Sequence, residues 1–184
     1  MPKKSKNAST ATSLPAFDDD KSLVHVIIET PKGCRNKYKF DPEMRAFKLS
    51  KVLPEGMVFP YDFGFIPDTN AEDGDPIDVL LLMDQPAFPG CVIESRLIGV
   101  IEAQQGKNGK SERNDRLIAV AQENHSYSDL KNLNEMNKTL LDDIGQFFVN
   151  YHEARGSRFK VLDIRGPKQA YRLLKKASSR AKAA

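Results

Sequence analysis

Cysteine is scarce in this chain, and its scarcity limits where the protein can work. Cys34 and Cys91 are the only two, and neither belongs to a CxxC pair. Two cysteines are too few for the disulfide framework of a small secreted domain, so a reducing compartment fits the sequence best.

Long apolar runs and targeting signals are lacking as well. No apolar stretch approaches the length of about 18 residues that crosses a bilayer as a helix. The first twenty residues contain neither the hydrophobic segment of a signal peptide nor the arginines of a transit peptide. We therefore expect a cytoplasmic protein without a membrane partner.

Neither sign of charge is in large excess. The 184 residues carry a formal net charge of +3, and no internal repeat is present. Basic residues gather at both ends of the chain: Lys3, Lys4, Lys6, Lys168, Arg172, Lys175, Lys176, Arg180 and Lys182. Such ends could contact nucleic acid or an acidic partner, but solvation is the more common explanation.

Length and composition predict one folded domain with short extensions. A hydrophobic content of 40% over 184 residues fits a single core. Residues 1–20 are rich in Lys, Ser, Thr and Ala and predict a disordered arm. We place the domain at residues 21–178 and a basic tail at residues 179–184.

Hydrophobic periodicity predicts strands first and helices last. β-Branched residues indicate a strand buried on both faces over Val24–Thr30, and alternation indicates a second at Asn36–Phe40. Further strands are expected at residues 46–49, 79–83, 91–101, 117–121 and 158–164. An amphipathic helix is predicted from Leu140 to Tyr151, and another begins at Pro167. This order favours an α+β fold, most simply a small barrel with helices outside it.

An aromatic row precedes the most acidic part of the chain. Phe59, Tyr61, Phe63 and Phe65 alternate along one segment. Spacing of two is typical of the hydrophobic face of a sheet, and we favour this interpretation over a platform for stacking nucleic-acid bases.

Five carboxylates lie within the eleven residues from Asp68 to Asp78, directly before an apolar run at residues 79–83. Gly74 permits positive φ and Pro76 fixes φ, so the loop between the acids is expected to be stiff. Rigid carboxylates suit hard cations such as Mg²⁺. On composition alone an ordinary acidic turn is the more common explanation. An EF-hand is excluded, because Ile77 stands where a ligand is needed and Asp78 where the loop requires glycine.

From about Val24 to about Ala177 the chain resembles the soluble family I inorganic pyrophosphatases. Asp73–Asp78, DGDPID, matches their DGDPxD signature. The order of further matching residues agrees with the family: Glu29, Lys37, Tyr38, Phe59, Pro60, Gly64, Pro89, Gly90 and Tyr151. The resemblance implies an OB-like closed β-barrel of about five strands with flanking α-helices. It also implies a homo-oligomer, a hexamer or a dimer, that hydrolyses pyrophosphate to two orthophosphates with Mg²⁺.

The resemblance also implies roles for particular side chains. Asp75 would take a proton from the attacking water, and Glu29 would act as an outer ligand of metal or water. The expected metal ligands are Asp73 and Asp78, joined by Asp115. The expected phosphate-binding residues are Lys37, Lys51, Arg116 and Tyr151.

Several residues depart from the family pattern close to this site. Lys39 replaces a glutamate, Lys51 an arginine, Phe59 and Phe63 tyrosines, Asn114 an aspartate, Arg116 a lysine and His152 a lysine. We hypothesise that Lys39 partly substitutes for the charge of an outer metal by pairing with Glu29, and that Glu112 or Asp115 supplies a replacement ligand.

Two alternatives to an active pyrophosphatase stay open on the sequence. One is a protein of the same fold that binds phosphate with little or no turnover. The other is a single-stranded nucleic-acid binder of the OB type, which the expected burial of the aromatic row disfavours.

Overall fold

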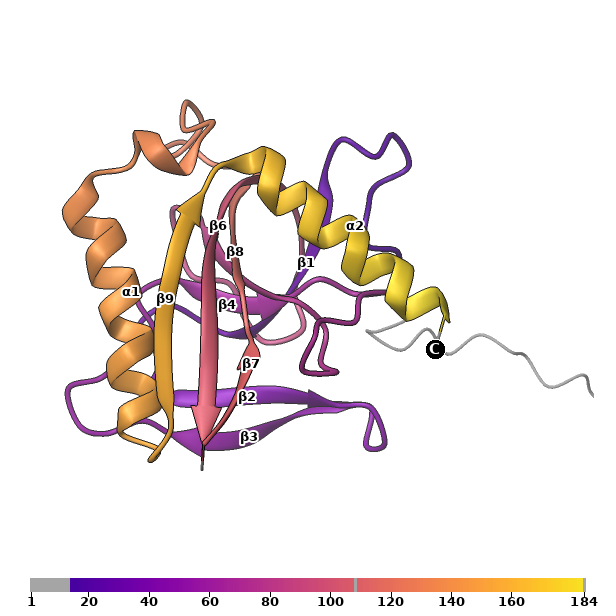
Figure 1. The fold of residues 1–184 in the computed structure, drawn as a ribbon. Helices are drawn as coiled ribbons and strands as arrows, with labels where there is room; N and C mark the ends of the chain where they lie inside the picture. Colours follow the sequence, from indigo (N-terminus) through magenta and orange to yellow (C-terminus); the bar gives the residue numbers. More distant parts are fainter. Residues whose placement is uncertain (1–13, 108, 184) are drawn as a thin grey trace, which may run out of the picture.

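The computed structural model of the chain describes residues 14–107 and 109–183. Figure 1 shows the arrangement of its elements. The strands are β1 (Val24–Thr30), β2 (Asn36–Asp41), β3 (Ala46–Val52), β4 (Asp62–Phe65), β5 (Asp78–Leu82), β6 (Val92–Lys107), β7 (Lys110–Arg113), β8 (Arg116–Ala121) and β9 (Arg158–Arg165). The helices are the short 3-10 helix η2 (Leu133–Glu135), α1 (Lys138–Glu153) and α2 (Pro167–Ala183).

Five strands close into a ring. The order β1-β4-β5-β8-β6 is completed by pairing of β1 with β6, which sets Val24 opposite Ser95 and Ile27 opposite Val92. Every pairing in the ring is antiparallel except β5 with β8. The hairpin of β2 and β3 forms a separate small sheet at the foot of the molecule in Figure 1. The predicted α+β fold with an OB-like barrel is confirmed.

Strand β6 is longer than its hydrophobic part predicts. The expected strand ended at Ile101, but β6 continues through polar residues to Lys107. This second half pairs with both β7 and β9, so its backbone groups are hydrogen-bonded even though its side chains are not apolar. Backbone pairing, rather than burial of side chains, extends the strand.

Alternate residues of the strands enter two different cores, as a period of two requires. Val79 and Leu81 of β5 belong to the core that α2 covers, whereas Leu80 and Leu82 belong to the core that α1 covers. The expected apolar stripe of the last helix is confirmed, since α2 contributes Ala170, Leu174 and Ala177 to the first core.

Strands β1 and β4 approach each other closely at Gly64. A Cβ atom at this position would lie 2.0 Å from the carbonyl oxygen of Ile27. Only glycine allows this approach, which holds the beginning of the acidic loop against the end of β1.

The aromatic row is part of the core. Phe59 and Phe63 are each 1% exposed and Phe65 is 5% exposed. The regular strand covers only Asp62–Phe65, because Pro60 lacks the N–H that a ladder needs. Phe59, Phe63 and Phe65 are therefore core side chains that cannot stack on bases, as the sequence favours, whereas Tyr61 is only partly buried.

The ends of the chain differ in part from the predicted division. Residues 1–13 of the expected arm and Ala184 of the expected tail lie outside the described residues. Ala16 is buried and Phe17 forms a bridge to Val24, so the described end of the arm packs on the domain. Helix α2 continues to Ala183, across most of the expected tail.

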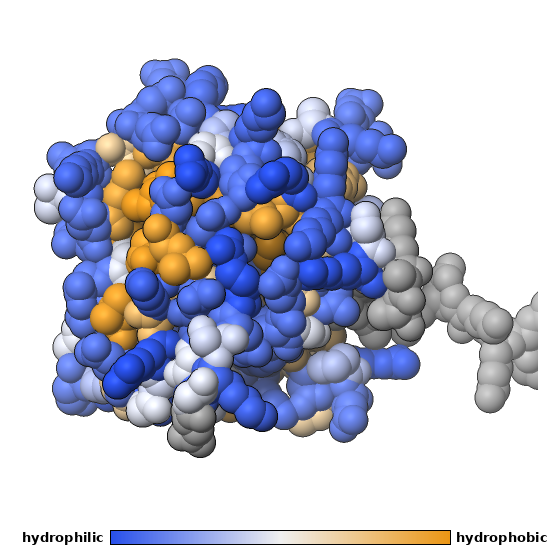
Figure 2. Space-filling model, in the orientation of Figure 1, coloured by the Kyte–Doolittle hydropathy of each residue, from blue (hydrophilic) through white to orange (hydrophobic). Residues whose placement is uncertain are grey.

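The face shown in Figure 2 is largely hydrophilic, with apolar side chains gathered mainly over β9. Leu162 of β9 is 39% exposed. In the described part of the chain, no helix combines the length and the apolar character needed to cross a bilayer.

Candidate active site

The acidic loop between β4 and β5 is held by hydrogen bonds at its base. The hydroxyl of Thr69 donates to the carbonyl oxygen of Ile66 over 2.6 Å and accepts from the backbone N–H of Ile77 over 3.0 Å. Gly74 has a φ of 84°, the positive value that the sequence predicts. The loop therefore presents its carboxylates from a fixed backbone at the start of β5.

These carboxylates face cationic side chains across a cavity of about 380 Å³. Of the catalytic, metal-binding and phosphate-binding residues that the sequence nominates, all line this cavity except Asp115 and the alternative ligand Glu112. The nominated lining residues are Glu29, Lys37, Lys51, Asp73, Asp75, Asp78, Arg116 and Tyr151. They come from β1, β2, β3, β5, β8, α1 and the acidic loop, so the closed ring brings together distant parts of the chain.

Two cations that line the cavity contact its carboxylates directly. Lys39 Nζ lies 2.8 Å from Asp75 Oδ2, and an Arg116 nitrogen lies 2.7 Å from Asp78 Oδ2. The hypothesis that Lys39 pairs with Glu29 is wrong, because its salt-bridge partner is Asp75. The buried guanidinium of Arg116 also bonds the side-chain oxygen of Asn114.

Glu29 is a buried carboxyl at the end of β1, with 6% of its surface exposed. Burial raises its pKa to about 7, and the nearby charge of Asp78 adds to the rise. The backbone N–H of Phe40 donates to Glu29 Oε1 over 2.9 Å and opposes part of the shift. The carboxyl therefore changes its charge near neutral pH.

Asp73 has no salt-bridge partner among the described residues. Burial raises the pKa of its carboxyl, an N–H from the backbone of Asp75 lowers it, and the charges of Asp78 and Asp75 raise it further. Repulsion among these acids falls when a cation binds between them.

The cations on the other side of the cavity lie over aromatic rings. Lys37 Nζ is 4.7 Å from the centroid of the Phe63 ring and 5.4 Å from that of Tyr151. An Arg155 nitrogen donates to the Tyr151 hydroxyl over 2.7 Å. Burial lowers the pKa of Lys51, and the positive charges of Arg155 and Lys37 lower it further. These side chains form a positive wall suited to a small polyanion.

His152 stands beside Tyr151 but is buried, with 4% of its surface exposed. Its ring stacks on Phe159 at a centroid distance of 4.9 Å. Burial lowers the pKa of the imidazole to about 3, and the charges of Arg116 and Arg155 contribute, so the ring is neutral at physiological pH.

Asp115 and Glu112 lie away from the carboxylates of the cavity. Asp115 pairs with Arg113 over 2.9 Å, accepts the N–H of Ala103 and lines a different hollow from Asn114 and Arg116. Glu112 accepts a hydrogen bond from Gln105 in a neighbouring hollow. Neither residue lines the cavity as a replacement ligand.

A family model described as inorganic pyrophosphatase matches residues 26–182. The chain belongs to the inorganic pyrophosphatase family. The family's enzyme from Synechocystis sp. is 42% identical over 144 residues, which cover 78% of this chain and 81% of the relative. That of Thermus thermophilus is 36% identical over 154 residues, covering 84% and 86%.

Solved structures of the family agree with this fold. The crystal structure of the inorganic pyrophosphatase from Thermus thermophilus has a TM-score of 0.86 at 34% identity and covers 95% of this chain and 99% of its own. That of Helicobacter pylori has a TM-score of 0.82 at 30% identity and covers 90% and 97%.

The acidic part of this family member's cavity suits a hard cation with few protein ligands. Within residues 14–107 and 109–183, no group of three or more His, Cys, Asp and Glu side chains is arranged to hold a metal ion. Mg²⁺ commonly takes only one or two carboxylates and completes its coordination with water and substrate phosphate. Asp73 and Asp78, whose carboxylates repel each other, fit that kind of site.

Sequence reasoning missed several residues that line the pyrophosphatase cavity, among them Gln105 and Arg155. Arg155 follows Tyr151 by four residues, the spacing that places two residues on one side of a helix, and this was the available signal. The sequence contains no comparable signal for Gln105, because this residue belongs to the polar extension of β6.

Proposed function

We propose that the chain hydrolyses pyrophosphate to two orthophosphates with Mg²⁺, using the cavity between the acidic loop and the β2–β3 hairpin. Membership of the family supplies the reaction, and hydrolysis in this family depends on a metal ion. The observation that carries the proposal for this chain is that carboxylates meet cations across one cavity, among them Lys37 and Lys51, which form no salt bridge within the described residues.

Asp73 and Asp78 are the proposed holders of Mg²⁺. Bound Mg²⁺ lowers the pKa of water and offsets negative charge on phosphate. Asp75 is proposed to accept the proton of the attacking water, because Lys39 occupies only one of its two oxygens. Glu29 supports the same region from the end of β1, as an outer ligand of metal or water.

Lys37, Lys51, Arg116 and Tyr151 are proposed to bind the phosphates. As the P–O–P bridge breaks, negative charge grows on the leaving phosphate, and fixed cations stabilise that charge. Arg116 is suited to this role because its guanidinium is held by Asp78 and lies over the ring of Phe148, 5.3 Å from its centroid.

Replacement of Asp75 tests the proposal. Phosphate release from pyrophosphate with Mg²⁺ is expected to fall about 10²- to 10⁴-fold in Asp75→Asn, the range for loss of a general base. The matched control is Glu72→Gln in the same loop, since Glu72 pairs with Lys176 and Arg180 and does not line the cavity. Folded wild-type protein that leaves pyrophosphate intact at every Mg²⁺ concentration would refute the proposal.

The same assay separates the phosphate-binding alternative. Tight binding of pyrophosphate without phosphate release would support a protein that has lost turnover. We further propose a cytoplasmic homo-oligomer, a hexamer or a dimer, and light scattering after size exclusion distinguishes these states from a monomer.

A further inference from the structure

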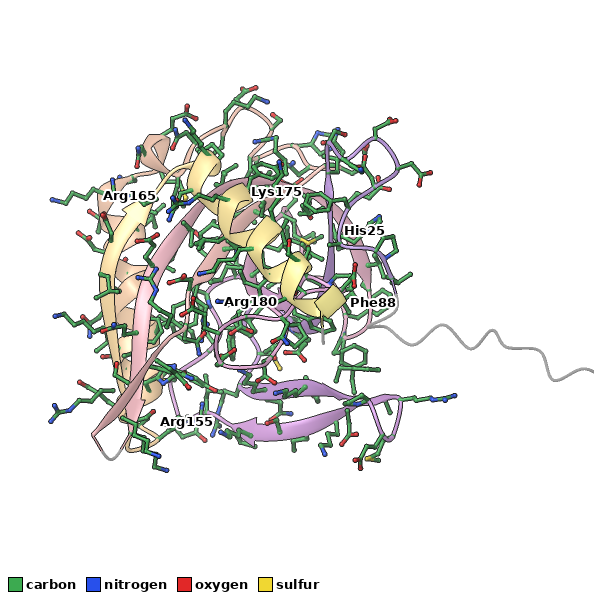
Figure 3. All side chains as sticks on the ribbon, turned by 45° about the vertical axis from the view of Figure 1, so that its right-hand side comes forward. His25, Phe88, Arg155, Arg165, Lys175 and Arg180 are labelled. Atoms are coloured by element: carbon green, nitrogen blue, oxygen red, sulfur yellow. The ribbon has the colours of Figure 1, made fainter. Side chains whose placement is uncertain are left out.

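A second hollow of about 680 Å³ adjoins the active-site cavity. Gln105, His152 and Arg155 line both spaces. The hollow then continues along the β6–β7 hairpin past Lys107, Lys110 and Ser111. Figure 3 shows Arg155 at the lower end of the molecule, where this hairpin and the β2–β3 hairpin also lie.

Positive charge predominates in the hollow. Its charged lining residues are Lys107, Lys110, Arg155 and a single acid, Glu112. Lys107 and Lys110 stand directly opposite each other in the β6–β7 ladder. Like charges in that position destabilise a hairpin, and neither lysine has a salt bridge within the described residues. A bound polyanion would offset this repulsion.

A buried hydrogen-bonding atom stands where the two spaces meet. His152 Nε2 is buried and has no partner among the described residues. The His152 carbonyl already accepts the backbone N–H groups of Arg155 and Ser157, each over 3.0 Å. The Ser157 hydroxyl lies 3.1 Å from this carbonyl oxygen and 3.1 Å from Nδ1. Because the two N–H groups already occupy both lone pairs of the oxygen, we infer that the hydroxyl donates to Nδ1. In this tautomer Nε2 carries the proton and is a neutral donor without an acceptor.

We propose that the hollow binds the third and following phosphates of a linear inorganic polyphosphate whose terminal two phosphates occupy the active-site cavity. His152 Nε2–H would donate to an oxygen at the junction, and Lys107, Lys110 and Arg155 would balance the charge of the tail. The inference rests on the proposed function, because it uses the same reacting centre.

The reaction on such a chain needs no additional reactant. Water attacks the terminal phosphorus near the acidic loop, the terminal P–O–P bond breaks, and the electron pair of that bond remains on the shortened chain. Tripolyphosphate and water thus give orthophosphate and pyrophosphate. The proton that water loses passes to Asp75 and from there to a phosphate product. The tail extends the leaving group, which lies on the side of Tyr151 and His152.

The test compares two substrates in two double variants. Lys107→Ala/Lys110→Ala removes two charges from the hollow, and Lys168→Ala/Lys175→Ala removes two from α2. Lys168 and Lys175 are exposed and form no salt bridge in the described part of the chain, unlike Lys176. We expect the first to lower kcat/KM for tripolyphosphate about tenfold and to change that for pyrophosphate less than twofold. The α2 variant should leave both substrates within twofold.

Binding supplies a readout that does not need turnover. Calorimetry with Asp75→Asn should show weaker tripolyphosphate binding, by about tenfold, when the two hairpin lysines are also replaced. Equal losses for both substrates, equal losses in the α2 control, or tripolyphosphate that neither binds nor reacts would overturn the inference. Loss of pyrophosphate hydrolysis alone would refute the proposed function instead, and the binding comparison would still decide the inference.

Discussion

Replacing Glu29 by glutamine should stabilise the protein, and by an amount that depends on pH. Glutamine keeps an oxygen to accept the N–H of Phe40 but removes the buried group that ionises. The shift of the Glu29 pKa from 4.5 to about 7 corresponds to about 3 kcal/mol, at about 1.4 kcal/mol per pH unit.

The sign of the pH dependence follows from which state, folded or unfolded, binds the proton of Glu29 more tightly. Because the folded pKa of Glu29 is the higher one, the folded state holds more protons than the unfolded state between pH 4.5 and pH 7. The stability that the protonated carboxyl contributes is therefore complete below pH 4.5 and is lost as the pH rises through about 7. Glu29→Gln does not undergo this loss.

Urea unfolding in EDTA, followed by circular dichroism, measures the effect. The free energy of unfolding of Glu29→Gln minus that of the wild type should rise by about 2 to 3 kcal/mol between pH 5 and pH 8. Exposed Glu123→Gln is the control and should differ from the wild type by less than about 0.5 kcal/mol at both values. A difference for Glu29→Gln that does not change with pH would refute the reasoning.

Two further changes test the site and the barrel. Lys39→Glu should tighten Mg²⁺ binding about twofold to fivefold, because the exposed pair of Lys39 with Asp75 is worth at most about 1 kcal/mol. Calorimetry measures the affinity and the stoichiometry. If both are unchanged, Lys39 does not substitute for the charge of a metal ion. Gly64→Ala should lower the free energy of unfolding by more than about 3 kcal/mol, because its Cβ would lie 2.0 Å from the Ile27 carbonyl oxygen. Gly145→Ala in α1, where the nearest side-chain atom is 3.4 Å from the new Cβ, is the control and should be neutral or stabilising by up to about 1 kcal/mol in the same urea titration.

Much of the fold could be predicted because burial leaves a periodic signal in the sequence. The β-branched run of β1 and the apolar stripe of α2 both indicate buried elements, and both elements are buried in the folded chain. If β8 is extended backward, strand parity predicts that Glu112, Asn114 and Arg116 share one face and that Asp115 points the other way. Asn114 and Arg116 line the cavity and Asp115 does not, but Glu112 does not line it either. These inferences concern neighbours along one strand or helix, where geometry follows from spacing alone.

Contacts between elements were harder to predict. The partner of Lys39 depends on how the β2–β3 hairpin docks over the acidic loop. The spacing of residues within β2 does not indicate how far Lys39 lies from each carboxylate of that loop. The polar half of β6 carries no hydrophobic pattern, so Gln105 and the adjoining hollow were missed. Predictions based on single segments therefore located the carboxylates better than their partners.

Closure of the ring through β1 and β6 has a consequence for the order of events on the ribosome. The edge of β1 that pairs with β6 stays unpaired until residues 92–95 have been synthesised. The ring stays open until β8 has been added. During synthesis the nascent chain therefore exposes unpaired apolar edges, a state prone to self-association. The unpaired strand edges should persist until Ala121 leaves the exit tunnel, and the apolar faces of the ring stay uncovered until α1 and α2 have followed.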